Sequence, residues 1–349
     1  MSTRTHHRAA IAASLVAAGI VALPGTASAR TSATTATATA TTAPLVKGLY
    51  QSAYSERNDA LWVTVSNGRP PVTATSLLKV DPDSLVVEQT ITPPVTDAAT
   101  GAREAVYGVA VDDEHNTVWV TNTRDNTVAV YSQRDGSHLA TLPDVAHARE
   151  IVVDERHNTV WATAFGSGTL VAYDSKTFEE KRRITVEGAS PAGVTVNDRT
   201  GTVYATDLAG DRIIAVTRAS DTPSFVPAGD GPISISLSRS GRTAYTADQT
   251  AGTVSVVDLR TGTVTKSVAT GAGALSLETD GRSGDVVVVN RTAATVTVVD
   301  PRAGVVEETV TTAANPNHVE VADGSAYVVD KSGAGAAGAD QMTRIDLRH

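Results

Sequence analysis

The chain has 349 residues, no cysteine and a formal net charge of −9. The lack of cysteine excludes disulfides and thiolate catalysis, and the acidic balance argues against nucleic-acid binding, which needs a basic surface to neutralise phosphates. Only 4% of the residues are aromatic, while Val, Ala, Thr and Gly are abundant. This composition is typical of many short strands joined by tight turns.

Residues 1–29 have the pattern of a secretory signal peptide. Arg4 and Arg8 form a basic start, residues 11–23 are mainly apolar and uncharged, and residues 27–29 (Ala-Ser-Ala) supply a small-residue cleavage site. The apolar run is shorter than the roughly 20 residues that span a bilayer. We therefore expect a secreted protein with no membrane span after signal cleavage. Residues 30–43 are rich in Thr and Ala, and such a segment buries too little apolar surface to become ordered, so we expect a disordered leader.

Residues 44–349 contain seven copies of one pattern. Each copy has a run of β-branched and aromatic residues, a turn and a second such run, and these seven residues occupy equivalent places in the first run: Trp62, Trp119, Trp161, Tyr204, Tyr245, Val287 and Tyr327. From Trp119 onward their spacing is 40 to 43 residues, which is room for four short antiparallel strands. Stacking such copies radially covers their apolar faces. The sequence predicts a single all-β domain, a seven-bladed β-propeller of four-stranded antiparallel blades, with an open β-solenoid as the alternative.

The ends of the repeat region predict how the ring closes. Only three residues follow the third strand of the last copy, so that copy lacks an outer strand of its own. Residues 41–47 precede the first copy and can supply it. We therefore predict that an N-terminal strand closes the ring.

The copies resemble the YVTN-type β-propeller repeats of secreted and surface-layer bacterial proteins. WVTN at Trp119 is the strongest local match, with YATD at Tyr204, YTAD at Tyr245 and YVVD at Tyr327 as variants. The resemblance extends from residue 48 to the end and implies a seven-bladed propeller with a binding or cell-surface role. Related seven-bladed propellers include lactonases and metal-dependent lyases, so the resemblance also implies an enzyme as an alternative.

The candidate site follows from the geometry of a propeller, in which the inner strand of each blade starts at the face where the second strand ends. The seven inner strands are predicted to start at Gln51, Gly108, Glu150, Gly193, Ser234, Ser276 and His318. Most of these residues are small, which would keep a channel open. The larger ones have polar or aromatic neighbours in the sequence, among them Arg149 and Tyr107. The second-strand ends add acids and amides to the same face: Asn122, Asp207, Asp248, Asn290 and Asp330.

Such a ring of acids, amides and imidazole suits a hard cation, a sugar or a basic peptide. Asn and Asp at strand ends also commonly cap turns, which is the structural alternative for the last five residues. We select as binding residues His318, Glu150, Gln51, Arg149, Tyr107 and the five strand ends.

These residues predict a monomer that binds a protein, a glycan or a small molecule at its channel face. We expect no catalysis and no cofactor, with a divalent cation as the one cofactor left open. A lactonase-like hydrolase or metal-dependent lyase using His318 and Glu150 is the first alternative. A structural cell-surface module is the second.

Overall fold

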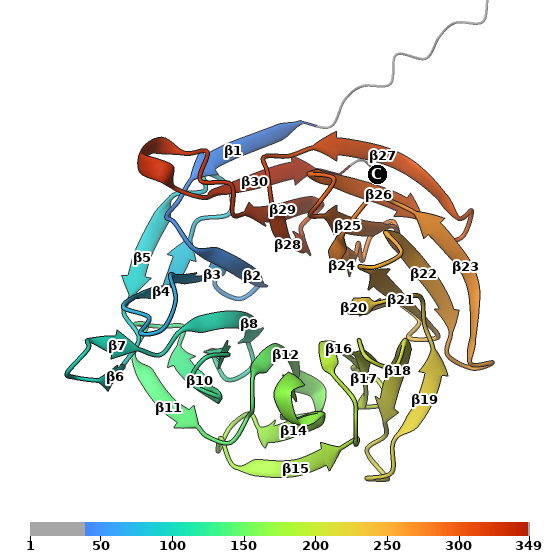
Figure 1. Ribbon diagram of the computed structural model, residues 1–349, viewed down its shortest axis with the longest axis horizontal. Coiled ribbons are helices and arrows are strands. Elements are labelled where there is room, and N and C mark those ends of the chain that lie inside the picture. The colour runs from blue at the N-terminus through green and yellow to red at the C-terminus, as the bar shows by residue number, and fades with distance from the viewer. Residues whose placement is uncertain (1–38, 348–349) are drawn as a thin grey trace, which may run out of the picture. The chain divides into compact units, whose positions relative to one another are not determined.

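The computed structural model describes residues 39–347. Seven four-stranded antiparallel sheets stand around a central opening, with the innermost strand of each sheet facing that opening (Figure 1). This confirms the predicted all-β, seven-bladed propeller. Within the described residues the helical segments are three single 3-10 turns: η1 (Glu155–His157), η2 (Phe165–Ser167) and η3 (Ala336–Gly338).

In blades 1 to 6 the strands follow one another outward in chain order. Blade 1 consists of β2 (Leu49–Ser55), β3 (Ala60–Asn67), β4 (Ala74–Val80) and β5 (Val87–Ile91). Blade 2 consists of β8 (Val106–Asp112), β9 (Thr117–Asn122), β10 (Thr127–Ser132) and β11 (His138–Leu142). Blade 3 consists of β12 (Ala148–Asp154), β13 (Thr159–Ala164), β14 (Thr169–Asp174) and β15 (Glu180–Thr185). Blades 4 and 5 consist of β16 (Pro191–Asn197), β17 (Thr202–Asp207), β18 (Arg212–Val216) and β19 (Ser224–Pro227); β20 (Pro232–Leu237), β21 (Thr243–Asp248), β22 (Thr253–Asp258) and β23 (Thr263–Ala269).

The remaining strands complete the ring. Blades 6 and 7 consist of β24 (Ala274–Thr279), β25 (Val286–Asn290), β26 (Thr295–Asp300) and β27 (Val305–Thr311); β28 (Pro316–Ala322), β29 (Ser325–Asp330), β30 (Gln341–Asp346) and β1 (Ala40–Pro44). A small separate hairpin, β6 (Val95–Asp97) and β7 (Ala102–Arg103), lies in the connection from blade 1 to blade 2.

The N-terminal strand closes the ring as predicted. β1 pairs antiparallel with β30, so the outermost strand of the last blade comes from the beginning of the described chain. Asp340 fastens this junction, because its Oδ2 accepts the backbone N–H of Gly48 at 2.6 Å and its backbone C=O accepts that of Leu45 at 3.0 Å. The strand starts at Ala40, inside the segment 30–43 that the sequence assigns to the leader. The predicted signal peptide and residues 30–38 lie outside the described residues.

The repeated large residue explains why the copies stack. Trp62 and Trp119 are fully buried, and each packs among apolar side chains of the following blade. Trp161 of blade 3 and Tyr245 of blade 5 also pack against the following blade. Tyr327 of blade 7 packs against blade 1. A large aromatic residue therefore fills five of the seven interfaces between blades, and Tyr327 seals the ring; Tyr204 is partly buried at its interface and the sixth copy has Val287 instead.

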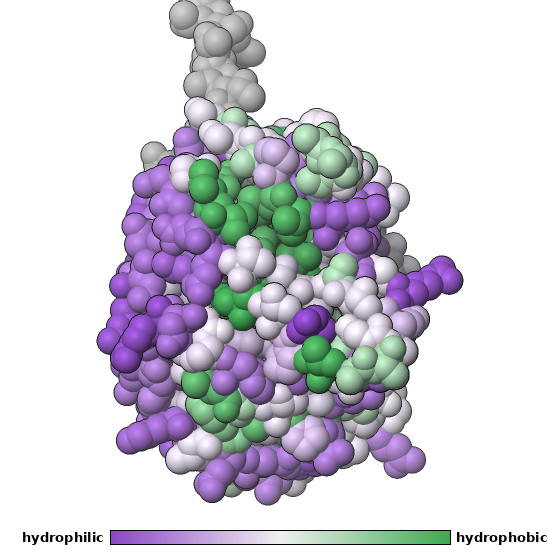
Figure 2. Space-filling view, turned by 90° about the vertical axis from the view of Figure 1, so that its left-hand side faces the viewer, coloured by the Kyte–Doolittle hydropathy of each residue, from purple (hydrophilic) through white to green (hydrophobic). Residues whose placement is uncertain are grey.

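The outer strands are the most exposed part of the blades. β23 and β27 expose Val264, Val305 and Val306, while the second strand of each blade is almost fully buried. Figure 2 shows the side that carries the closing strand and β5, where apolar areas alternate with polar ones. No helix within residues 39–347 is long and apolar enough to cross a membrane.

Candidate binding site in the central channel

The inner strands of all seven blades enclose a cavity of about 550 Å³. This volume lies within the range of about 300–1,000 Å³ typical of small-molecule sites. The seven residues predicted as strand starts all line it, although each inner strand begins two residues earlier: Gln51, Gly108, Glu150, Gly193, Ser234, Ser276 and His318. The repeat alone therefore located one complete layer of the channel wall.

A second layer lies two residues further along each inner strand, because alternate residues of a strand face the same side. It is lined by Ala53, Ala110, Val152, Thr195, Ser236, Glu278 and Glu320. Sequence reasoning missed the two glutamates, since it stopped at the first channel-facing position of each strand. Applying the two-residue period to Ser276 and His318 would have found them.

Gly108 and Gly193 are small for a different reason from the one predicted. A Cβ on Gly108 would lie 2.5 Å from the backbone oxygen of Arg149 in the next blade. A Cβ on Gly193 would lie 2.7 Å from the Cα of Ser234, again in the next blade. Glycine at these positions therefore permits close approach of neighbouring inner strands, and an open channel is a secondary result.

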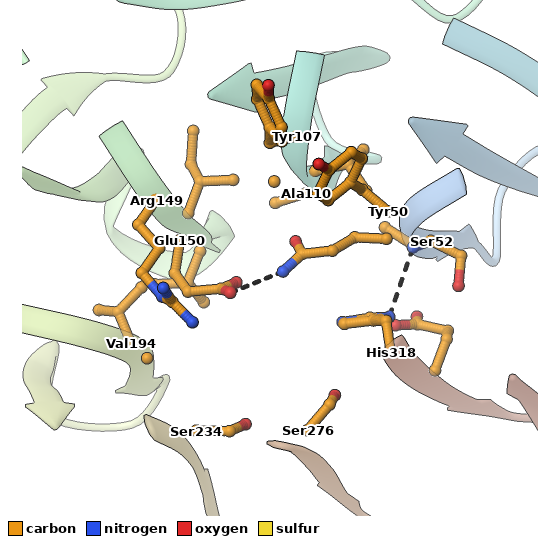
Figure 3. A pocket seen from close by; sticks show the side chains of 18 of the residues that line it. Tyr50, Ser52, Tyr107, Ala110, Arg149, Glu150, Val194, Ser234, Ser276 and His318 are labelled. Atoms are coloured by element: carbon orange, nitrogen blue, oxygen red, sulfur yellow. Dashed lines mark hydrogen bonds between the residues drawn. The ribbon is translucent and has the colours of Figure 1, made fainter. Parts of the chain in front are cut away.

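Arg149 and Glu150 project into the cavity from β12, next to Gln51 from β2 (Figure 3). The Gln51 Nε2 donates a hydrogen bond of 2.6 Å to the Glu150 Oε1. Burial raises the pKa of Glu150, while Arg149 and the Gln51 hydrogen bond act in the opposite direction. The buried Nε of Arg149 has no hydrogen-bond partner. An unpaired buried donor is costly, so this guanidinium is the clearest unsatisfied group of the site.

Aromatic and basic side chains form one rim of the cavity. The rings of Tyr50 and Tyr107 meet edge to face, with their centroids 4.4 Å apart. The Nζ of Lys331 lies 3.3 Å from the centroid of the Tyr50 ring and donates to the backbone oxygen of Leu49 at 2.9 Å. Burial lowers the pKa of Lys331 to about 8. The Nε of Arg124 donates to the Tyr107 hydroxyl at 3.3 Å. This rim supplies positive charge and aromatic faces to an incoming ligand.

His318 lines the same cavity from β28, next to Ser52 of β2 and across the channel from Glu150 (Figure 3). Its Nδ1 accepts the backbone N–H of Ser52 at 3.4 Å, and burial lowers its pKa to about 4. The imidazole is therefore neutral at pH 7. Because Nδ1 acts as an acceptor, the proton of the neutral ring resides on Nε2. His318 thus offers a hydrogen-bond donor to the cavity.

Glu278 and Glu320 form the acidic part of the second layer. The Oε2 of Glu278 accepts the backbone N–H of Val321 at 2.6 Å, and the Oε1 of Glu320 accepts that of Tyr54 at 2.8 Å. Burial raises the pKa of both carboxyls, to about 7 for Glu320, and the charge of Glu320 raises that of Glu278 further. Both carboxyls therefore hold their protons to a higher pH than an exposed glutamate does.

The inner strands are free sheet edges, and two kinds of side chain satisfy them. In blades 1 to 3 a threonine of the second strand bonds the bulge of its own inner strand and the backbone of the next blade, and in blade 4 Thr206 accepts the N–H of Gly193 in its own inner strand. Thr121 shows this: its Oγ1 accepts the N–H of Gly108 at 2.8 Å and donates to the oxygen of Arg149 at 2.9 Å. In blades 5 to 7 the channel-facing side chains themselves accept N–H groups of the next inner strand: Ser234, Ser236, Ser276, Glu278, His318 and Glu320.

The five strand-end residues selected from sequence are not on the cavity wall of the described chain. They are 0–2% exposed and lie inside their blades: Asn122, Asp207, Asp248, Asn290 and Asp330. Asp248 accepts hydroxyl hydrogen bonds from Thr246 and Ser255, and Asp207 pairs with Arg212 at 2.8 Å. These groups satisfy local turns and side chains, which is the structural alternative that the sequence offered. The site retains Gln51, Tyr107, Arg149, Glu150 and His318.

The arrangement of the acidic and imidazole side chains bears on whether the channel could bind a divalent cation. Among residues 39–347, no group of three or more His, Asp or Glu side chains could hold a metal ion. The strands that carry Glu278 and Glu320, β24 and β28, lie across the channel from β12, which carries Glu150 (Figure 1). This arrangement favours an extended ligand over a single ion.

The fold and its cavity define a seven-bladed β-propeller with a polar channel site. No protein-family model matches the chain. It is similar to the uncharacterized protein YncE of Salmonella typhi, with 25% identity over 241 residues, which are 64% of this chain and 65% of that protein. YncE of Escherichia coli O157:H7 is 26% identical over 239 residues, with the same two shares. The chain thus spans about 65% of the length of the curated relatives that it matches.

Solved structures share the fold at lower identity. A streptogramin B lyase superposes with a TM-score of 0.71 and 14% identity over 89% of this chain and 98% of that one. Kuenenia stuttgartiensis hydrazine synthase superposes with a TM-score of 0.72 and 12% identity over 86% of this chain and 96% of that one. A catalytically inactive histidine-to-alanine variant of Staphylococcus aureus virginiamycin B lyase with quinupristin gives 0.69 and 12% over 89% and 100%. Identities this low show a common fold alone.

Proposed function

We propose that this protein is an exported binding protein, active as a monomer, that holds a small molecule in its central channel. The observation that carries the proposal is the cavity of about 550 Å³, into which the Arg149 guanidinium projects with a buried Nε that lacks a partner. Groups of both charge signs line the cavity, and a few polar groups in an enclosed space are what a specific small-molecule site requires.

A thermal-shift screen of a metabolite library tests this proposal. A compound that binds the folded protein raises the melting midpoint. At 100 times its dissociation constant it adds about 2.7 kcal/mol to the free energy of unfolding. Ala110→Phe fills the second layer of the cavity and should abolish the shift caused by each authentic ligand. Ala99→Phe, on an exposed turn, is the matched control and should leave the shift unchanged. Ligands that bind Ala110→Phe as well as wild type would refute a channel site.

Catalysis is the second candidate, and it rests on Glu150 and His318 facing the same cavity. The neutral imidazole carries its proton on Nε2, so it donates to a bound molecule and does not act as a general base toward it. We therefore favour binding. Incubating the protein with quinupristin, followed by chromatography, separates the two candidates. Consumption of quinupristin that His318→Ala abolishes would establish a lyase and overturn the binding proposal.

Export is tested on the protein recovered from cells. Cleavage after Ala29 leaves a mature chain that begins at Arg30. The intact mass of the protein from the culture medium should match residues 30–349, and size exclusion should give the mass of one chain. An uncleaved chain confined to the cell interior would contradict export and leave the channel proposal intact.

A further inference from the structure

We propose that the channel ligand is a small zwitterion of the short-peptide class, with its carboxylate on Arg149 and its ammonium between Glu278 and Glu320. This inference rests on the proposed function and names the ligand class of the same cavity. Three features carry it. Arg149 lies on one wall without a hydrogen-bond partner for its Nε, Glu278 and Glu320 on the opposite wall each accept a backbone N–H with one carboxyl oxygen only, and the cavity leaves space between them.

Arg149 supplies the anion site. Its Nε is buried without a hydrogen-bond partner, and the arginine ion pairs within residues 39–347 are formed elsewhere in the ring by Arg182, Arg183, Arg212, Arg282 and Arg344. The fully buried Nε is out of reach of a channel ligand, so a carboxylate would be held by the two Nη groups through parallel hydrogen bonds. The adjacent Glu150 competes weakly, because its Oε1 is held by Gln51 and burial raises its pKa.

Two further arginines reinforce this end of the cavity. Arg124 bonds the hydroxyl of Tyr107, and Arg291 bonds the side-chain oxygen of Asn317 at 3.0 Å. Both partners are neutral, so the positive charge of these arginines stays uncompensated by an ion pair. In a chain of net charge −9, this concentration of cations draws anions toward one mouth of the channel.

Glu278 and Glu320 supply the cation site. Each uses one carboxyl oxygen for a backbone N–H, of Val321 and of Tyr54, and the other oxygen is left for the channel. The titratable side chains that share this part of the wall are His318 and Tyr54, with Glu150 and Arg149 across the channel. An ammonium with three N–H donors satisfies both free oxygens and ionises the pair.

The spacing of the two sites selects the ligand length. β12, which carries Arg149, faces β24 and β28, which carry the glutamates, across the opening (Figure 1). The glutamates also lie one layer deeper than Glu150, about 7 Å along the channel at the rise of a β-strand. A molecule with separated charges spans this diagonal, and the termini of a di- or tripeptide have such a separation. The cavity of about 550 Å³ accommodates it.

Triglycine and its two capped forms test the proposal by isothermal titration calorimetry. Triglycine should bind, while N-acetyl-triglycine and triglycine amide should each bind at least about tenfold more weakly. Arg149→Gln should remove the preference for triglycine over its amide, and Glu320→Gln the preference over the acetylated form. Binding should also release protons near pH 7, seen as a dependence of the heat on the buffer, and Glu320→Gln should abolish this release.

Arg134→Gln and Glu187→Gln change the same residue types on the exposed surface and are the matched controls. Both should bind as wild type does. Equal affinity for triglycine and its capped forms, or no binding of triglycine in the millimolar range, would overturn the zwitterion proposal. If triglycine fails but a library compound is lost in Ala110→Phe, the channel is a binding site for another class. If neither occurs, the proposed function fails as well.

Discussion

Glu320→Gln isolates the charge of a carboxyl held within the channel wall. The glutamine oxygen can still accept the N–H of Tyr54, so the substitution removes the negative charge and keeps that hydrogen bond. The variant also removes the repulsion that Glu320 exerts on Glu278. We expect Glu320→Gln to stabilise the folded protein at alkaline pH and to be nearly neutral in acid.

The sign follows from the direction of the shift. Burial raises the pKa of Glu320 from 4.5 in the unfolded chain to about 7 in the folded protein. The folded state therefore binds the proton more tightly, and the contribution of Glu320 to stability is complete below pH 4.5 and is lost as the pH rises to about 7. Such a shift corresponds to at most about 3.4 kcal/mol. Water in the open channel reduces this, and we expect about 1–2 kcal/mol.

Urea unfolding of wild type and variant near pH 4.5 and near pH 8 measures the difference. His318 loses its own stabilising contribution as the pH falls from 6.5 to about 4, the opposite direction, because burial lowers its pKa. That effect is common to both proteins and cancels in the difference. Glu187→Gln on the surface controls for the loss of a charge as such. An equal difference between wild type and Glu320→Gln at both pH values would refute the assignment of a buried, uncompensated carboxylate.

Three further predictions concern the ring. Gly108→Ala should lower the free energy of unfolding by about 1–3 kcal/mol, because the new Cβ meets the next blade. Gly281→Ala, with open space around it, should lower it by almost nothing. Equal losses of stability in the two variants, measured by melting, would contradict the close-approach argument. Thr121→Val should cost about 1–3 kcal/mol in urea unfolding, since it leaves two buried backbone groups unpaired, and an unchanged midpoint would refute this role. Deleting residues 30–47 removes the closing strand and should lower the melting midpoint sharply, whereas deleting residues 30–37 should not; the closure mechanism fails if both truncations melt together.

The sequence was sufficient to predict the propeller because the repeat is itself the unit of packing. In most copies the large residue, such as Trp119, fills an interface between blades, so its spacing counts the blades. The closing strand was predictable for a related reason, since a blade with three strands leaves a free edge. Its start at Ala40 was not, because a Thr/Ala-rich segment becomes ordered only through its pairing with β30.

The site was predictable only in part. Glu150 and His318 stood out because they interrupt a series of small residues at one repeat position. The direction of a polar side chain at a strand end depends on its neighbours: Asp248 is drawn inward by nearby hydroxyls, and nothing in the YTAD motif at Tyr245 distinguishes this from a channel-facing acid. Glu278 and Glu320 required following the strand to its next inward position.

The two ways in which the inner strands are tied to one another have a consequence for how the protein can diversify. In blades 1 to 3 the ties between neighbouring inner strands come from threonines behind the wall, so changing Gln51 or Glu150 leaves these ties in place and removes only the hydrogen bond between the two side chains. In blades 5 to 7 the same side chains hold the neighbouring strand and face the channel, so replacing Glu320 by a residue without a carbonyl oxygen at that place alters both roles at once. Directed evolution of a new specificity should therefore accumulate substitutions on the β2 and β12 side, while the β24 and β28 side stays nearly fixed.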